Sequence, residues 1–283
     1  MFLIFLAGIL WGTIGIFVNT LNSFGASSAL TSFLRMFFGF LIMFAFAFSK
    51  HGKKIFISDK KILFVCALLG IIANGFFNIC YTASIKLNGM GVACVLMYSA
   101  PVFTAIASRI FFREKIGTLK IFALALNILG CVLTVTGGKI FQNQSLSLIG
   151  LLAGIYTGFG YGMAAIFGRM AGEKTDALII GVYSFFFAMI FLLIFNRPEF
   201  NFDFKVLGTG FLYGLIPTAL AYTVYYTGLK KIKDTSKVPV IASIEPVTAV
   251  ALGLVIYNEQ IGPANFIGVA IVILSIIIIM KAK

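Results

Sequence analysis

The chain has 283 residues, of which 60% are apolar and 11% are charged. Soluble domains carry about 25% charged residues, so this composition excludes a soluble globular protein and indicates one embedded in lipid. The formal net charge of +13 would suit nucleic-acid binding, but the cations lie in short loops between long apolar stretches. We therefore expect no nucleic-acid partner.

Ten apolar stretches follow one another along the chain, each close to the roughly 20 residues that a helix needs to cross a bilayer. They are residues 2–19, 29–49, 62–84, 88–108, 120–138, 148–168, 177–196, 206–229, 238–257 and 263–280. Because they are uninterrupted and show no alternation of period two, we expect helices rather than barrel strands. The first stretch lacks a basic leader and a convincing cleavage site, which indicates a first span rather than a signal peptide.

The second five stretches repeat the first five. Tyr81, Pro101, Glu114, Ile116 and Gly117 return 145 positions later as Tyr226, Pro246, Glu259, Ile261 and Gly262, and Ala7, Gly8 and Gly12 return 146 positions later as Ala153, Gly154 and Gly158. Two copies with an odd number of spans must lie in opposite orientations, as in many secondary transporters. The sequence thus predicts an all-α integral membrane protein with ten transmembrane helices in two inverted five-helix repeats. The repeats are residues 1–138 and 148–283, and residues 139–147 form a linker.

The placement of the cations predicts the orientation of the chain. With a cytoplasmic N-terminus, seventeen of the 22 Lys and Arg residues fall on the cytoplasmic side, four fall outside, and Arg35 lies within a span. This bias follows the positive-inside rule and predicts a multi-pass protein of the inner or plasma membrane with both termini cytoplasmic. Arg113 and Lys115 are replaced by Asn258 and Gln260 in the second repeat, an exchange that inversion requires.

The sequence lacks the motifs of a metal, cofactor or catalytic site. The four cysteines lie in apolar stretches without a C-x-x-C pair, and the single histidine, His51, lies in a lysine-rich loop. A P-loop, an H-E-x-x-H motif and a G-x-S-x-G motif are all missing. We expect no metal, no cofactor and no enzyme activity. An intramembrane enzyme and a channel or scaffold are the alternatives of other classes, and no repeated selectivity element supports a channel.

Several short motifs lie along the chain, and those at the end of the first repeat have counterparts at the end of the second. They are Leu10-Trp11-Gly12, Arg35, Ser99-Ala100-Pro101-Val102 with Arg113-Glu114-Lys115-Ile116, and Ile244-Glu245-Pro246-Val247 with Asn258-Glu259-Gln260-Ile261. This pattern resembles the EamA branch of the drug/metabolite transporter superfamily over essentially the full chain. The resemblance implies transport of amino acids, other metabolites, drugs or choline-like cations. Trp11 and Arg35 have no like partner at Thr157 and Gly181, so these two features are not duplicated.

Arg35 and Glu245 are the two charged residues that lie well inside spans. A charge at membrane depth costs a few kcal/mol and usually faces a cavity or a partner. A zwitterionic solute could present its carboxylate to Arg35 and its ammonium to Glu245, and Glu245 could alternatively take and release a proton. The structural alternatives are that Arg35 snorkels outward or bonds helix carbonyls, and that Glu245 caps a helix break at Pro246.

Pro101 and Pro246 occupy equivalent mid-span positions. Each removes a backbone hydrogen bond, so the pair predicts a helix break that lines the site or acts as a hinge. A fixed kink that improves packing is the alternative.

Polar and aromatic side chains of several spans extend the predicted substrate site. Trp11, Asn78, Tyr98 and Tyr222 are its members beside Arg35 and Glu245. An apolar pocket with a few placed hydroxyls and amides suits a small molecule. Hydrogen bonding between helices is the alternative for each of these residues.

The sixth span carries a ladder of small residues, namely Gly150, Gly154, Gly158 and Gly162. Glycines at this spacing let helix backbones approach closely, so we assign them to helix packing. A sliding face between two moving bundles is the alternative.

These observations favour a secondary transporter that works by alternating access, with an amino-acid or related metabolite exporter as the first hypothesis. The alternative is a carrier of choline-like or other organic cations or drugs, which would use Glu245 and a cage of aromatic rings. The expected partners are the lipid bilayer and a small-molecule substrate. Protons as the coupling ion, the direction of transport and the oligomeric state stay open, although a monomer suffices in principle.

Overall fold

The computed structural model describes residues 1–57, 59–139, 146–258 and 260–282, and every regular element in these ranges is a helix. Nine helical stretches of this part are long and apolar enough to cross a membrane. The stretch Lys60–Met97 contains Gly89 with φ 80° and ψ 160°, where the chain reverses and begins a further pass. The prediction of ten transmembrane helices is confirmed. Most of the predicted linker, and Glu259, lie outside the described residues.

The first repeat supplies five passes. They are α1 (Phe2–Gly12) with α2 (Ile14–Ser23); α3 (Ser28–His51), followed by the short 3-10 helix η1 (Gly52–Ile55); α4 (Lys60–Gly70) with the π-helical turn η2 (Ile71–Phe76) and the first part of α5 (Phe77–Met97); the rest of α5 with α6 (Ala100–Phe112); and α7 (Thr118–Thr136).

The second repeat supplies the other five passes. They are α8 (Leu148–Gly172); α9 (Ala177–Phe195); α10 (Phe204–Gly214) with the π-helical turn η3 (Leu215–Leu220) and α11 (Ala221–Leu229); the 3-10 turn η4 (Thr235–Lys237) with α12 (Val238–Ala242) and α13 (Ile244–Tyr257); and α14 (Pro263–Lys281).

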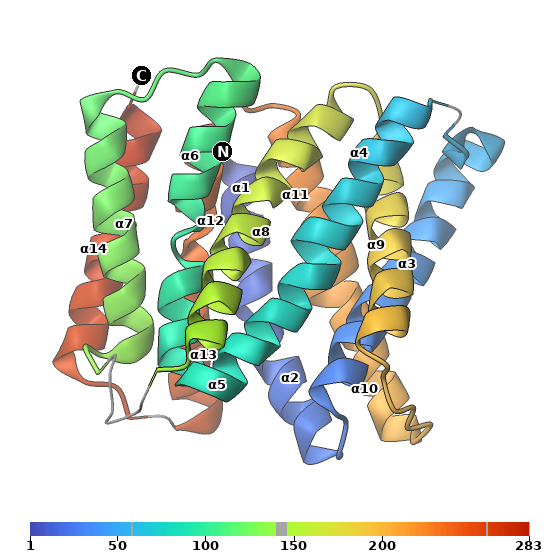
Figure 1. Cartoon of the computed structure of the whole chain (residues 1–283), viewed down its shortest axis with the longest axis horizontal. Helices are drawn as coiled ribbons and strands as arrows, with labels where there is room; N and C mark the ends of the chain where they lie inside the picture. The colour runs from blue at the N-terminus through green and yellow to red at the C-terminus, as the bar shows by residue number, and fades with distance from the viewer. Residues whose placement is uncertain (58, 140–145, 259, 283) are drawn as a thin grey trace.

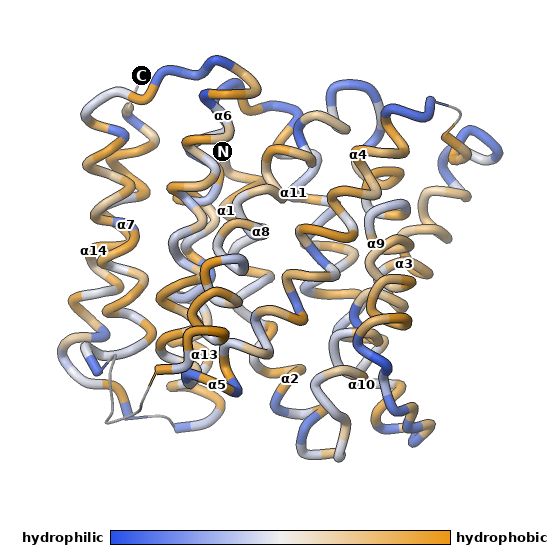
Figure 2. Tube along the Cα trace, viewed as in Figure 1, coloured by the Kyte–Doolittle hydropathy of each residue, from blue (hydrophilic) through white to orange (hydrophobic). Residues whose placement is uncertain are grey.

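The helices begin where a loop offers a side chain that caps them. Ser27, Asp59, Ser147, Asp176 and Asp203 each accept a hydrogen bond from a backbone N–H of the first turn that follows. These N–H groups have no partner within the helix, so capping stabilises the start of a span at the edge of the bilayer. Figure 2 shows the result, hydrophobic residues along the helices and hydrophilic residues at their ends.

Helices of one repeat pack mainly on helices of the other. The second passes, α3 and α9, lie against each other, and the fifth passes, α7 and α14, form a pair at one side of the bundle (Figure 1). Helix α1 packs on α11 and α13, while α8 packs on α5 and α6 in the equivalent way. The repeats are therefore interlocked, and the centre of the bundle lies between them.

Both chain ends lie at one end of the bundle, the upper end in Figure 1. The loops at residues 113–117, 173–176 and 230–234 lie at the same end. We call this end the terminal face and the other end the opposite face.

The fourth and ninth passes, predicted at 88–108 and 238–257, are each interrupted shortly before the proline at which the sequence predicts a break. Helix α5 ends at Met97 and α6 begins at Ala100, whereas α12 ends at Ala242 and α13 begins at Ile244. Pro101 is the second residue of α6 and Pro246 is the third residue of α13. Proline is tolerated there because the N–H groups of a first helical turn have no acceptor within the helix.

The two π-helical turns occupy equivalent places in the third and eighth passes. The Nδ2 of Asn74 donates to the carbonyl of Leu69 at 3.2 Å, and the Oγ1 of Thr218 donates to the carbonyl of Tyr213 at 2.9 Å. In both turns the bonded carbonyl lies five residues before the donor, so a side chain stabilises the wide turn. Such turns are frequent at functional sites.

Two glycines at equivalent positions allow close contact with the broken passes. A Cβ on Gly12 would lie 2.5 Å from the Cβ of Thr248 in α13, and a Cβ on Gly158 would lie 2.6 Å from the carbonyl of Leu96 in α5. The other ladder members, Gly150, Gly154 and Gly162, also face α5 and α6, close to Asn88, Leu96 and Ala100. The structure places the whole ladder in a tight helix contact.

We expect Gly12→Ala to destabilise the protein by about 1–3 kcal/mol, because the added methyl group forces α1 away from α13. Gly15→Ala is the matched control, since a Cβ there meets nothing within 4 Å. The apparent Tm of the two purified variants in detergent checks this prediction. Equal Tm values for the two would contradict the close packing described above.

Candidate functional site

Four aromatic side chains meet at the centre of the bundle, between the repeats. The ring of Trp11 in α1 lies 4.9 Å from that of Tyr225, 5.1 Å from that of Tyr222 and 6.2 Å from that of Tyr161, measured between centroids. We call Trp11, Tyr161, Tyr222 and Tyr225 the aromatic cage. Tilted and edge-to-face contacts of this kind stabilise aromatic clusters.

The indole N–H of Trp11 has no hydrogen-bond acceptor among the described residues, although Trp11 is only 4% exposed. A buried donor without a partner costs about 1–3 kcal/mol. A ligand that brings an acceptor into the aromatic cage would remove this cost.

Glu245 lies beside the cage, at the second position of α13. Its Oε2 accepts a hydrogen bond from the hydroxyl of Tyr161 at 2.8 Å, and its side chain is partly exposed. The preceding residues contain the break at Ser243, so the carboxylate lies in the first turn of a new helix. A negative charge is stabilised there by the helix dipole and the unpaired N–H groups.

Arg35, in α3, lies close enough to Tyr222 and Glu245 for their charges to interact. It is 7% exposed, its Nε donates to the Oγ1 of Thr218 at 3.3 Å, and its guanidinium lies 5.5 Å from the centroid of the Tyr213 ring. Thr218 belongs to the π-helical turn η3. An irregular turn of the second repeat therefore binds Arg35, a cationic residue of the first repeat. A tyrosine ring at this distance also stabilises the charge.

Arg35 and Glu245 attract each other across the site, but neither forms an ion pair within the described part of the chain. Each is instead held by neutral hydroxyl and aromatic groups. Neutral partners offset the desolvation of a charge only in part, so a counter-charge supplied by a ligand would stabilise Arg35, which is buried, and Glu245, which is partly exposed.

The break beside Glu245 is fixed by a buried polar contact. The Nδ2 of Asn127 in α7 donates to the Oγ of Ser243 at 2.5 Å and to the Oγ of Ser275 in α14 at 3.0 Å. All three side chains are at most 5% exposed. The paired helices α7 and α14 thereby position the residue at which the ninth pass is interrupted.

The other predicted site residues lie near this centre with different roles. Tyr98 is 8% exposed at the end of α5, next to the break before α6, and lies close enough to Glu245 to interact with its charge. Asn78 donates to the carbonyl of Asn74 at 2.6 Å and accepts from Ser32 at 3.5 Å. The structure thus brings Trp11, Tyr222, Arg35 and Glu245 together, while Asn78 links α5 to α3.

Several residues of the site are not among those predicted from the sequence. Tyr161 binds Glu245 directly, Thr218 binds Arg35, and the Oδ1 of Asn74 accepts from the hydroxyl of Tyr222 at 3.2 Å. Tyr161 lies one helical turn after Thr157, the repeat partner of Trp11. An aromatic residue one turn after the repeat partner of Trp11 is therefore the sequence signal that points to Tyr161.

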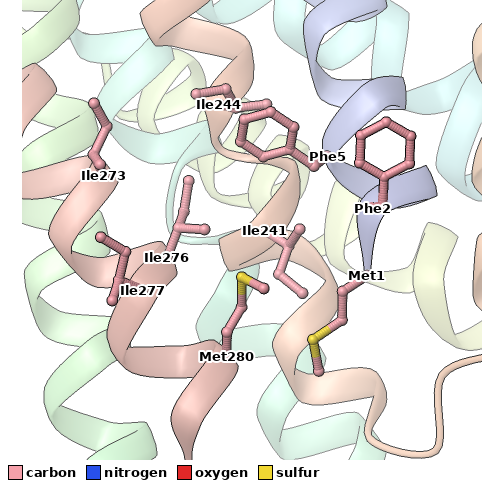
Figure 3. A pocket seen from close by; sticks show the side chains of 9 residues that line it. All are labelled: Met1, Phe2, Phe5, Ile241, Ile244, Ile273, Ile276, Ile277 and Met280. Atoms are coloured by element: carbon pink, nitrogen blue, oxygen red, sulfur yellow. The ribbon is translucent and has the colours of Figure 1, made fainter.

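A separate cavity of about 420 Å³ lies between α1, α12, α13 and α14 (Figure 3). Its lining consists of isoleucine, phenylalanine and methionine side chains, including Phe5, Ile244 and Met280. Ile244 lines this cavity whereas the next residue, Glu245, bonds to Tyr161 in the cage. Because no polar group faces the cavity, it does not suit a charged solute, and the candidate site is the aromatic cage with its two charges.

A bundle of ten passes in two repeats, with charged and aromatic groups gathered between them, defines a membrane transporter. The sequence profile of the EamA-like transporter family matches residues 1–136 and 148–281. The chain therefore belongs to the EamA-like transporter family, as its motifs predicted.

Proteins of similar sequence are also named as transporters. An uncharacterized transporter of Archaeoglobus fulgidus is 27% identical over 278 residues, which cover 97% of this chain and 94% of that protein. The uncharacterized inner membrane transporter YicL of Salmonella typhimurium is 24% identical, covering 98% of this chain and 93% of that protein. The crystal structure of another protein superimposes with a TM-score of 0.84 at 15% identity, over 99% of this chain and 97% of that chain, which shows the fold alone.

We expect Thr218→Val to destabilise the protein by about 1–3 kcal/mol, because it leaves the Nε of Arg35 without its acceptor and removes the bond that stabilises η3. Thr223→Val in α11 is the matched control, since its hydroxyl only donates to the carbonyl of Ala219 one turn earlier. The apparent Tm of each variant is the measurement. A control that loses as much stability as Thr218→Val would contradict the special role of Thr218.

Proposed function

We propose that this transporter exports amino acids or related zwitterionic metabolites across the cell membrane by alternating access. One observation carries the proposal. Arg35 and Glu245 carry opposite charges and each interacts with a tyrosine of the aromatic cage, Arg35 with Tyr222 and Glu245 with Tyr161, yet neither has an ion-pair partner among the described residues.

A zwitterionic solute supplies both missing counter-charges. Its carboxylate fits the guanidinium of Arg35, which offers parallel N–H donors in a planar fork. Its ammonium group fits Glu245 and the faces of the neighbouring rings. The free N–H of Trp11 would give the carboxylate a further donor, and the rings of the aromatic cage offer apolar contacts to a substrate side chain.

The position of the site between interlocked repeats supports alternating access. Trp11 and Arg35 come from the first repeat, whereas Tyr161, Tyr222 and Glu245 come from the second. Movement of one repeat against the other therefore changes access to the site without dismantling either repeat. The breaks before α6 and before α13 are suitable hinges for such a movement.

Glu245 also supports proton coupling. Its carboxylate can bind either a proton or the ammonium group of a substrate, but not both at once. Mutually exclusive binding at one group couples the two flows in opposite directions, so inward proton movement would drive export.

The lysine-rich loops support the orientation. The loops at 50–57, 113–120 and 230–237 lie with both chain ends at the terminal face (Figure 2). By the positive-inside rule this face is the cytoplasmic one.

A carrier of organic cations is the second candidate, because aromatic rings beside a carboxylate are a known way to bind a quaternary ammonium group. Trp11, Tyr161 and Glu245 form such a group. Arg35 disfavours this candidate, since a buried guanidinium in the same site repels a cation that has no carboxylate.

Trp11 is the single tryptophan of the chain and reports directly on the site. We expect its fluorescence in the purified protein to change on titration with amino acids, and to change less with choline or simple carboxylates. Arg35→Gln and Glu245→Gln should each weaken amino-acid binding roughly 10- to 100-fold, because a charge-assisted hydrogen bond contributes about 1.5–3 kcal/mol. Arg109→Gln, at an exposed arginine, is the matched control and should bind normally.

A response confined to quaternary amines, unaffected by Arg35→Gln, would replace the zwitterion proposal with the organic-cation carrier. If Arg109→Gln weakened amino-acid binding as much as Arg35→Gln, the loss of any cation would be enough to weaken binding. That result would contradict a direct role of Arg35 in binding the substrate.

We expect proton movement to accompany transport in proteoliposomes that contain a pH-sensitive dye. Addition of an amino acid that binds in the Trp11 assay should change the internal pH with the wild-type protein and leave it unchanged with Glu245→Gln, because the glutamine has no titratable group. Glu173→Gln, an exposed carboxylate at the terminal face, is the matched control. A Glu245→Gln variant that still moves protons would contradict the coupling role.

A further inference from the structure

Side chains of both repeats also meet at the terminal face, away from the aromatic cage. Glu114 lies in the loop between α6 and α7, and its side chain is 9% exposed. Its Oε1 accepts a hydrogen bond from the backbone N–H of Thr235 at 2.8 Å, and its Oε2 accepts one from that of Ser236 at 3.1 Å. A carboxylate of the first repeat is thus bound to the first residues of the ninth pass in the second repeat.

Arg169 strengthens this contact from α8. Its Nη1 forms an ion pair with Glu114 and donates to the carbonyl of Lys233 at 3.2 Å and to the Oγ1 of Thr235 at 2.5 Å. Its guanidinium lies 4.0 Å from the centroid of the Phe112 ring at the end of α6. Charge-assisted hydrogen bonds of this kind are stronger than neutral ones.

A second ion pair lies alongside. The Nζ of Lys120 in α7 pairs with Asp234 and donates to the carbonyl of Lys115 at 2.9 Å. Partial burial acts to raise the pKa of Asp234, but hydrogen bonds from Lys120 and Ser236 hold the pKa of that carboxyl below its ordinary value. Glu114, Lys120, Arg169 and Asp234, with the backbone of residues 235–236, are called the clasp.

The clasp is directly connected to the candidate site along the chain. Residues 235–237 form η4, which continues into α12, and α12 ends at the break beside Glu245. The side chains of Val238, Val240, Ile241 and Ala242 are at most 2% exposed, so α12 fills the space between the clasp and the cage. Release of η4 would free the segment that closes this end of the site.

The opposite face cannot form the same ion pairs. The repeat partners of Arg169, Lys120 and Asp234 are Ser23, Asn265 and Gly89, none of which is charged. The contact there between Asn88 and Ser147 consists of neutral hydrogen bonds at 2.7 and 3.1 Å. Among the described residues, ion pairs join the repeats at the terminal face, whereas neutral hydrogen bonds join them at the opposite face.

We propose that the clasp is the gate at the terminal face, with Glu114 as the gating residue whose release opens the aromatic cage to the cytoplasm. The proposal rests on the transport cycle and orientation inferred above. The clasp is partly exposed, so water can solvate its charges once they separate, which makes a reversible contact feasible. The structure is the state in which this gate is closed.

Native Cys94 provides a reporter, because its sulfur lies 3.2 Å from the hydroxyl of Tyr81 in the interior and it is 4% exposed. The experiment uses the full chain with Cys66, Cys80 and Cys131 changed to alanine. A cationic, membrane-impermeant methanethiosulfonate reagent is added to the cytoplasmic side of inside-out vesicles, and the labelling rate of Cys94 is measured without any substrate.

We expect Glu114→Gln to raise this rate roughly tenfold or more, because the loss of charge-assisted bonds shifts the gate toward its open state. Labelling from the extracellular side of right-side-out vesicles should not rise. Glu173→Gln is the matched control, since Glu173 also faces Arg169, at 3.8 Å, but is 59% exposed and directly follows α8, the helix that carries Arg169. It should leave both rates unchanged.

An unchanged rate in Glu114→Gln would overturn the proposal, as would an equal rise from both sides, which indicates general loosening. A rise from the extracellular side alone would overturn it too. The labelling rate of Cys94 is measured without a ligand. A result that overturns the gate proposal therefore does not change the interpretation of the Trp11 fluorescence titrations. Conversely, failure of the zwitterion proposal leaves the labelling result interpretable.

Discussion

The hydrocarbon core of a bilayer offers no hydrogen bonds, and every polar group within it must find a partner inside the protein. The spans meet this requirement with uninterrupted helix almost everywhere. The exceptions are the π-helical turns at η2 and η3 and the breaks before α6 and α13. All four lie between the repeats, where side chains such as Asn74, Thr218 and Asn127 satisfy or position the irregular backbone. The same enclosed space tolerates Arg35 and Glu245.

Interlocking follows from the way the two repeats cover each other. Helix α1 reaches the break of the ninth pass through Gly12, and α8 reaches the break of the fourth pass through Gly158. Neither repeat could bury these irregular segments alone, so the candidate site and the fold depend on one interface. The two repeats differ in sequence at this interface. Trp11 and Glu245 have no like partners at Thr157 and Ala100, so each contributes its side chain to the candidate site from one repeat only.

Much of this architecture is readable from the sequence, because membrane spans and inverted repeats leave long-range patterns in hydropathy and in the positions of proline and glycine. Arg35 and Glu245 were identifiable because charges at membrane depth are rare. The π-helical turns were not, since they depend on which carbonyl Asn74 and Thr218 bond in the folded bundle. The pairing of Tyr161 with Glu245 depends on the rotation of α8 against α13, which no local pattern encodes. The ninth pass breaks at Ser243 rather than at Pro246 because Asn127 holds that residue from a different helix.

The one-sided clasp has a thermodynamic consequence for any carrier built this way. Ion pairs at one face and neutral bonds at the other make the two access states unequal in free energy. That inequality belongs to the protein and cancels over a complete cycle, so it cannot change the gradient that transport finally reaches. It sets only how long the empty carrier waits in each orientation. If the clasp is the gate proposed above, the bonds of Glu114 to η4 lengthen the time that the empty carrier spends closed at the terminal face.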